Sequence, residues 1–273
     1  MRLTRFAPLA FAAALSFATG SRAAAADDTI VLYGAGSLRE AMTEMAVLFE
    51  KTRGIAVRAE FGASGRMRER IEAGDKVDLF ASADIGHAAK LVKDGRASVM
   101  AMFAQNALCL LSPAQANMGS GPLDAMLKQR MRIGVSPAKI DPLGDYTVEL
   151  FKAADGLRRG SGAILAARAV TLDNPPGTPP AKSGDYVLDA MRDGKVDLAI
   201  VYCSSRARYA KLDSSLTMTE FPPELSVGPQ YGLAVLKDAK TTALLLALTI
   251  LSPEGQAILA RSGFRPVGLP AVQ

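Results

Sequence analysis

The stretch Thr29-Ile30-Val31-Leu32-Tyr33-Gly34-Ala35-Gly36-Ser37 decides the fold. Its first five residues are β-branched, apolar or aromatic, which favours a strand. Gly34-Ala35-Gly36 is typical of a tight turn. From Ser37 to Thr52 the apolar residues recur at helical spacing on one stripe, and Gly54 ends the pattern. The stretch therefore predicts a strand, a turn of small residues and a helix in immediate succession.

The same order recurs along the chain. The pattern predicts further strands over 55–61, 77–81, 107–111, 132–135, 197–202 and 231–236. It predicts further helices over 66–73, 85–94, 145–154, 186–191, 241–251 and 253–262. The segment 173–184 holds four prolines and predicts an exposed loop. Strands that alternate with helices indicate an α/β protein with parallel strand pairing.

The N-terminal segment has the features of a secretory signal peptide. A basic start with Arg2 and Arg5 precedes an apolar run from Phe6 to Phe17, and Ala24-Ala25-Ala26 fits a cleavage site. We expect residues 1–26 to be removed near Ala26 and the mature protein to be exported to the periplasm. The apolar run is too short to span a bilayer, and no later run is long enough.

The charge balance argues against a nucleic-acid partner. The whole chain carries 32 Lys and Arg against 27 Asp and Glu, a net +5. Cleavage near Ala26 would remove three arginines and no acid, which leaves +2. A mature chain so close to neutral lacks the strong basic excess that nucleic-acid binding requires.

The composition also limits metal and thiol chemistry. The single histidine, His87, excludes a site built from several histidines, and two cysteines exclude a disulfide-rich miniprotein. Cys109 and Cys203 can form one disulfide in an oxidising compartment, or can remain two buried thiols. The sequence leaves both alternatives open, because pairing depends on the distance between the two Cα atoms.

Two serines stand where a predicted strand gives way to a helix. Ser37 follows Gly36, and its spacing to Glu40 fits a helix-capping box. Ser64 follows Gly62 in the next turn, and the glycine there allows a ligand to approach the backbone. Ligands of open α/β sheets bind at the carboxyl ends of strands, near helix N-termini. Both serines are therefore candidates for binding an anion as well as for capping a helix.

A set of motifs carries a resemblance to a known family. These motifs are Gly34-Ala35-Gly36-Ser37-Leu38, Phe61-Gly62-Ala63-Ser64, Ile71-Glu72-Ala73-Gly74, Val77-Asp78-Leu79-Phe80-Ala81-Ser82-Ala83-Asp84, Asp141-Pro142-Leu143-Gly144-Asp145-Tyr146, Leu198-Ala199-Ile200-Val201-Tyr202 and Ser252-Pro253-Glu254-Gly255-Gln256. Together they resemble the periplasmic molybdate-binding proteins of ABC importers, which are class II solute-binding proteins. The resemblance runs from about Ile30 to Phe264.

The resemblance implies a fold and a domain division. It implies the two-lobed type II periplasmic-binding-protein fold, in which each lobe is a mixed sheet flanked by helices. Lobe one would comprise residues 27–105 and 228–273, and lobe two residues 106–227. Two strands that cross near Asn106 and Val227 would form the hinge.

The resemblance also implies a ligand and its contacts. Such proteins hold molybdate or tungstate between the lobes and deliver it to a membrane permease. Ser37 and Ser64 fall where the family donates from lobe one, and Tyr202 falls on its phenolic donor. Leu143 and Gly184 fall where it uses main-chain N–H groups, although Leu143 is larger than usual and Gly184 replaces an apolar residue. The implied protein is a monomeric receptor and not an enzyme; it uses no cofactor and binds no cation directly.

Other functions stay open at this level. The same fold could hold sulfate, phosphate, or ferric iron bound by Tyr202, Tyr146 and Asp145. A secreted serine hydrolase would use Ser64 with His87, although Arg66 replaces the last glycine of the hydrolase G-x-S-x-G turn. Donors without a full counter-charge fit a deprotonated oxyanion best, because such a ligand offers acceptors only.

Overall fold

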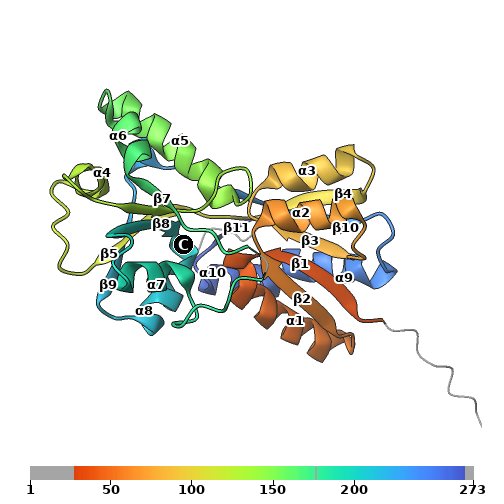
Figure 1. Ribbon diagram of the computed structural model, residues 1–273. Coiled ribbons are helices and arrows are strands. Elements are labelled where there is room, and N and C mark those ends of the chain that lie inside the picture. The colour runs from red at the N-terminus through yellow and green to blue at the C-terminus, as the bar shows by residue number, and fades with distance from the viewer. Residues whose placement is uncertain (1–27, 176, 268–273) are drawn as a thin grey trace, which may run out of the picture.

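The computed structural model describes residues 28–175 and 177–267, which form two lobes, each built on one sheet (Figure 1). The predicted signal peptide lies outside these residues. The chain passes from the first sheet to the second at residues 106–107 and returns through residues 221–229. Two crossings of this kind are what the type II fold requires of its hinge.

The first sheet has six strands in the order β11-β4-β10-β3-β1-β2. β1 pairs in parallel with β2 and β3, whereas β10, β4 and β11 are antiparallel to their neighbours, so the sheet is mixed. The bounds are β1 Ile30–Ala35, β2 Val57–Gly62, β3 Leu79–Ser82, β4 Ala97–Gln105, β10 Gln230–Leu236 and β11 Arg265–Pro266.

Helices cover both faces of the first sheet (Figure 1). They are α1 Arg39–Arg53, α2 Ser64–Ala73, α3 Ile85–Lys93, α9 Thr241–Leu251 and α10 Pro253–Arg261. Successive strand residues point to opposite faces. Accordingly, Leu32 of β1 belongs to the core cluster with α1 and α9, whereas Tyr33 belongs to the cluster with α2 and α3.

The second sheet has five strands in the order β7-β6-β8-β5-β9. Its strands are β5 Leu108–Pro113, β6 Ile133–Val135, β7 Ala169–Thr171, β8 Leu198–Tyr202 and β9 Leu216–Glu220. Its helices are α4 Pro122–Leu127, α5 Pro142–Leu157, α6 Ser161–Arg168, α7 Tyr186–Arg192 and α8 Arg206–Leu212. β8 pairs antiparallel with β5 and parallel with β6, so this sheet is mixed as well.

The prediction that Ser37 caps a helix is wrong, and the sequence pattern misses several of the described elements: β4, β7, β9, β11, α4, α6 and α8. β4 is a nine-residue strand that the sequence pattern does not predict, because Ala-Ser-Val-Met-Ala-Met-Phe-Ala-Gln is rich in alanine and methionine and does not alternate cleanly. Ser37 is not a helix cap. It lies in the short 3₁₀ helix η1 (Gly36–Leu38), α1 begins at Arg39, and Leu38 at the cap position makes no side-chain bond.

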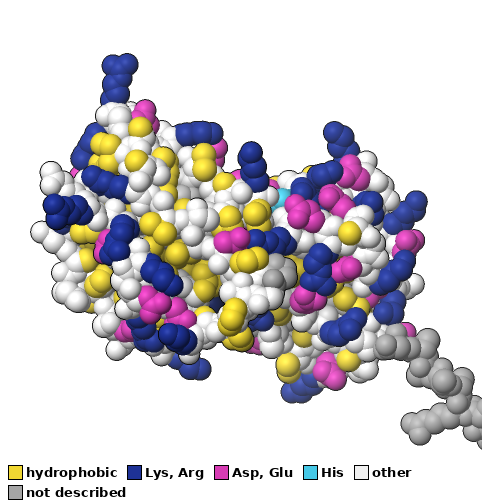
Figure 2. All heavy atoms as spheres, in the orientation of Figure 1, with side chains coloured by type: hydrophobic (Ala, Val, Ile, Leu, Met, Phe, Trp, Pro, Cys, Tyr) yellow, Lys and Arg dark blue, Asp and Glu magenta, His cyan; other side chains and the backbone are white. Residues whose placement is uncertain are grey.

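The surface carries both signs of charge. On the face drawn in Figure 2, basic and acidic side chains are interspersed over both lobes. Among the described residues, no single helix is both long and apolar enough to cross a membrane. α9 and α10 together reach the required length, but they bend by 61° where they meet.

Candidate functional site

A pocket of about 260 Å³ lies between the two sheets. Its walls come from the ends of β1, β2 and β8 and from the segments that open α2, α5 and α7. All five residues expected to bind the ligand line it: Ser37, Ser64, Leu143, Gly184 and Tyr202. The volume lies below the usual range for drug-sized ligands, so the pocket suits a small guest.

Ser64 offers a free hydroxyl proton. It is the first residue of α2 and is fully buried. Its Oγ accepts the N–H of Ala83 at 3.1 Å. A hydroxyl has one proton and two lone pairs, so this bond leaves the proton of Ser64 for another acceptor. Its position on the pocket wall makes a bound ligand the natural acceptor.

Ser37 reaches the pocket from η1 and is held from far along the chain. Its Oγ lies 2.9 Å from the hydroxyl of Tyr231, which is 194 residues later. This contact replaces the predicted capping bond, since the hydroxyl of Ser37 bonds to Tyr231 and not to the backbone of α1. Tyr231 itself is fully buried in β10.

Tyr202 has a buried hydroxyl with no hydrogen-bond partner among the described residues. It is the last residue of β8, and its side chain is 5% exposed. Burial raises the pKa of its phenol well above the usual value, which keeps the proton on the oxygen. A buried polar group without a partner costs about 1–3 kcal/mol, so such groups are rare in native proteins. A pocket-lining phenol in this state indicates a site that a ligand completes.

The two main-chain donors expected from the sequence already have acceptors. The N–H of Leu143 donates to Asp141 Oδ1 at 3.1 Å, which caps α5. The N–H of Gly184 donates to the carbonyl oxygen of Ala181 at 3.0 Å, in a turn where Gly184 has φ +80°. The sequence analysis missed Tyr186 and Val187, which line the same pocket and open α7. The first N–H groups of a helix have no acceptor within it, so these two amides are available.

Charged side chains around the pocket are largely paired. Arg66 contacts Asp173 at 2.7 Å, and Arg208 contacts Asp185 at 2.7 Å. Asp185 also caps α7 by accepting the N–H of Leu188. These pairs cancel locally, so hydroxyl and amide dipoles provide most of the attraction for an anion.

Two further pocket residues are Asp141 and Arg39, one acidic and one basic. Desolvation by burial raises the pKa of the Asp141 carboxyl, although the N–H of Leu143 partly opposes this effect. Arg39 lies over the ring of Phe61, with its guanidinium carbon 5.0 Å from the ring centroid. The pocket wall therefore carries one acidic and one basic side chain, which contact a backbone amide and an aromatic ring respectively.

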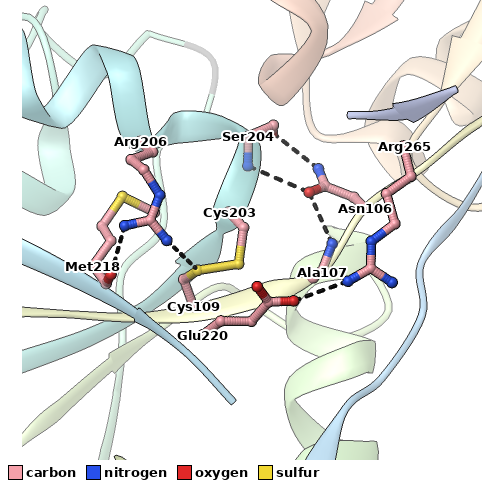
Figure 3. The surroundings of a disulfide bond; sticks show 9 residues. All are labelled: Asn106, Ala107, Cys109, Cys203, Ser204, Arg206, Met218, Glu220 and Arg265. Atoms are coloured by element: carbon pink, nitrogen blue, oxygen red, sulfur yellow. Dashed lines mark hydrogen bonds and ion pairs between the residues drawn. A yellow bond between two sulfur atoms is a disulfide. The ribbon is translucent and has the colours of Figure 1, made fainter. Parts of the chain in front are cut away.

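A disulfide joins Cys109 to Cys203, which settles the alternative left open by the sequence (Figure 3). Cys109 lies in β5 and Cys203 directly follows Tyr202, in the 3₁₀ helix η2 (Cys203–Ser205). The bond therefore ties the end of the strand that carries Tyr202 to its neighbour. Figure 3 also shows Asn106 reaching toward Ser204, one residue beyond the disulfide.

The residues needed for the alternative chemistries do not meet in the pocket. His87 contacts the guanidinium of Arg68 and does not line the pocket that holds Ser64. Tyr146 donates to Asp84, and Asp145 accepts the N–H of Lys139; neither lines the pocket. Across the described part of the chain, no cluster of three His, Cys, Asp or Glu residues could hold a metal ion.

The fold is similar to those of several solved binding proteins. The periplasmic molybdate-binding protein of Azotobacter vinelandii has a TM-score of 0.71 at 20% identity, over 88% of this chain and 99% of that one. The sulfate-binding protein SubI of Mycobacterium tuberculosis has a TM-score of 0.73 at 18% identity, over 88% and 87%. Iron-bound HitA of Pseudomonas aeruginosa has a TM-score of 0.65 at 19% identity, over 90% of each chain. At these identities the likeness shows the fold.

Sequence comparison identifies the family. The chain is 31% identical over 238 residues to an uncharacterized protein of Pasteurella multocida, covering 86% of this chain and 98% of that protein. It is 25% identical over 243 residues to the molybdate-binding protein ModA of Mycobacterium bovis, covering 86% and 84%. The family described as bacterial extracellular solute-binding protein matches residues 30–265. The chain therefore belongs to the bacterial extracellular solute-binding proteins.

Proposed function

We propose that this protein captures a tetrahedral oxyanion, molybdate or tungstate, between its lobes and delivers it to the permease of an ABC importer. The observation that carries the proposal is the buried hydroxyl of Tyr202, which lines the pocket and finds no hydrogen-bond partner within residues 28–175 and 177–267. A ligand oxygen that accepts this proton would remove the cost of leaving it unpaired.

The donors around Tyr202 support an anion over a cation or a neutral guest. Ser64 has its proton free, and Ser37 reaches the same pocket from the neighbouring strand end. Tyr186 and Val187 add amides at the start of α7. In this proposal the N–H of Leu143 is shared between Asp141 and the anion, and Gly184 contributes a main-chain contact at the pocket wall. Hydrogen bonds to a charged acceptor are roughly twice as strong as neutral ones, which offsets the desolvation of a dianion.

Contacts between the lobes support capture by closure. The N–H of Gly65 in α2 donates to the carbonyl oxygen of Ile140 at 2.9 Å. Arg66 pairs with Asp173 across the same gap, and Tyr146 of α5 donates to Asp84 Oδ2 at 3.2 Å. A ligand that is bound by both lobes favours the state in which these contacts form, and a permease can recognise that state.

Titration calorimetry tests the ligand. The purified protein is titrated with molybdate, tungstate, sulfate and hydrogenphosphate, each at the same ionic strength. A titration with ferric citrate tests whether the protein binds iron instead. We expect saturable binding of molybdate and tungstate, and weaker binding of the smaller sulfate and of hydrogenphosphate. Strong binding confined to sulfate, phosphate or iron would instead assign the pocket to that ligand.

The remaining parts of the proposal concern processing and organisation. We propose periplasmic location after cleavage near Ala26, a monomeric protein, lobe one at 27–105 with 228–273, and lobe two at 106–227. N-terminal sequencing of protein recovered from the periplasm checks the cleavage site. Light scattering after size-exclusion chromatography checks the monomer, because a dimer would double the measured mass.

A further inference from the structure

We infer that Asn106 is a positioning residue for ligand binding, because it fixes the hydroxyl of Ser37 as a donor through the phenol of Tyr231. This inference rests on the proposed oxyanion function and deepens it. Asn106 lies where the chain passes from β4 to β5 and is 2% exposed. It touches both lobes through its side-chain amide.

The orientation of the Asn106 amide is determined by its neighbours. Its Oδ1 faces two backbone N–H groups, those of Ala107 at 2.9 Å and Ser204 at 3.3 Å. A backbone N–H can only donate, so the oxygen of the amide must face that side. Its Nδ2 then faces two hydroxyl oxygens, Tyr231 at 3.0 Å and Ser204 Oγ at 2.9 Å. The two amide protons are both used in these bonds.

This orientation decides the direction of the next bond. The oxygen of Tyr231 accepts a proton from Asn106, so the phenol's own proton must go to another acceptor. Ser37 Oγ lies 2.9 Å away and is the acceptor on its other side. In this proposal Tyr231 donates to Ser37, because Ser37 Oγ is the one hydroxyl acceptor within hydrogen-bond distance of it among the described residues, and the proton of Ser37 is left for the pocket that Ser37 lines. One buried amide thus makes a distant serine a donor.

The consequence concerns which oxyanions bind. An oriented donor suits an anion without a proton, such as molybdate. It opposes an anion that carries a proton, such as hydrogenarsenate, because two donors then face one another. At mildly alkaline pH both anions have two negative charges. The ratio of their affinities therefore measures how the site responds to the proton on hydrogenarsenate, and not how it responds to charge. The relay should therefore favour molybdate in this ratio.

Asn106→Asp reverses the relay. A carboxylate accepts the proton of Tyr231, whose oxygen then accepts the proton of Ser37, and Ser37 presents lone pairs to the pocket. We expect the molybdate-to-hydrogenarsenate affinity ratio to fall by about tenfold, the cost of one mismatched buried pair. Asn174→Asp is the matched control, because Asn174 lines the pocket but takes no part in the relay. It adds the same charge, lowers both affinities and keeps the ratio.

Tyr231→Phe keeps the test sharp should Asn106→Asp fail to fold. Without the phenol, Ser37 rotates freely and can donate or accept, so the ratio should fall by about threefold. The double variant should have the same molybdate-to-hydrogenarsenate affinity ratio as Tyr231→Phe alone, because without the phenol Asn106→Asp has no relay to reverse. An unaltered ratio in Tyr231→Phe, or equal effects of Asn106→Asp in both backgrounds, would overturn the inference. Absence of any oxyanion binding by the unmodified protein would overturn the proposed function instead, and this inference with it.

Discussion

Gly65 and Ile140 approach one another across the gap between the lobes more closely than any residue with a side chain at position 65 would allow. The N–H of Gly65 donates to the carbonyl oxygen of Ile140 at 2.9 Å. A Cβ on Gly65 would stand 2.5 Å from that same oxygen, a separation that real Cβ atoms essentially never show. The closed arrangement therefore needs a residue without a side chain where α2 meets the loop before α5.

Gly65→Ala should therefore weaken ligand binding without weakening the unliganded fold. Alanine is favoured over glycine within α2, so the ligand-free melting temperature should stay the same or rise. Closure is obstructed, and we expect affinity to fall by about tenfold, as overpacking by one methyl group costs about 1–3 kcal/mol. Calorimetry and thermal unfolding measure the two effects separately. Gly156→Ala, a helix position with open space around it, is the control and should leave affinity unchanged.

Ser64→Ala should lower anion affinity by about 1–3 kcal/mol, because it removes a donor to a buried charge. It should also reduce stability, since the N–H of Ala83 loses its acceptor. Ser37→Ala should lower affinity by a similar amount. Ser161→Ala is a matched control, because Ser161 is buried but does not line the pocket. Unchanged affinity in both site variants would remove the two serines from the proposed site.

Tyr202→Phe should have opposite effects on affinity and on ligand-free stability. The hydroxyl is buried and has no hydrogen-bond partner in the described part of the chain, so its removal should keep or raise the melting temperature of the unliganded protein. Affinity for molybdate should fall by about 1–3 kcal/mol, because the phenol is a proposed donor. Tyr33→Phe provides the contrast. The hydroxyl of Tyr33 donates to Asp75 at 2.6 Å, and Tyr33 does not line the pocket. The Tyr33→Phe variant should therefore lose stability and keep its affinity for molybdate.

The disulfide should contribute to stability. It joins residues 94 apart, and closing a loop of that length in the unfolded chain stabilises the fold by about 2–5 kcal/mol. Cys109→Ala with Cys203→Ala should lower the free energy of unfolding by that amount in urea. The unmodified protein should react with a thiol reagent only after reduction. Two reactive thiols in the unreduced protein would contradict the pairing.

Asp141 should make binding depend on pH. Burial raises its pKa, so the folded state holds the proton more tightly than the unfolded chain. Its contribution to stability should therefore be greatest below the ordinary pKa of the carboxyl in the unfolded chain and should be lost as pH rises through the raised pKa of the folded state. Oxyanion affinity should decline over the same interval, because the ionised carboxylate lies in the pocket wall. Asp141→Asn should raise affinity and flatten both pH profiles; an identical profile in the variant would exclude Asp141 as the titrating group.

Local sequence patterns predicted much of the fold. Period-two and helical spacings identified most strands and helices, since they depend on residues only a few positions apart. Ser37 and Ser64 could be singled out because strand ends and helix starts are marked by small residues and turns, whereas Tyr202 was named only by the resemblance to a known family. β4 escaped prediction because its composition favours a helix, and its pairing with β10 determines its conformation.

The sequence by itself determined the order of most strands and helices, the turns at their ends and the two serines that follow those turns, because these depend on residues only a few positions apart. The tertiary structure alone decided which groups remain free to bind. It joined Cys109 to Cys203, paired the hydroxyl of Ser37 with that of Tyr231, and left the hydroxyl of Tyr202 without a partner among the residues that the structure describes. Such pairings join residues far apart in the chain, and only the arrangement of strands within each sheet brings their atoms together.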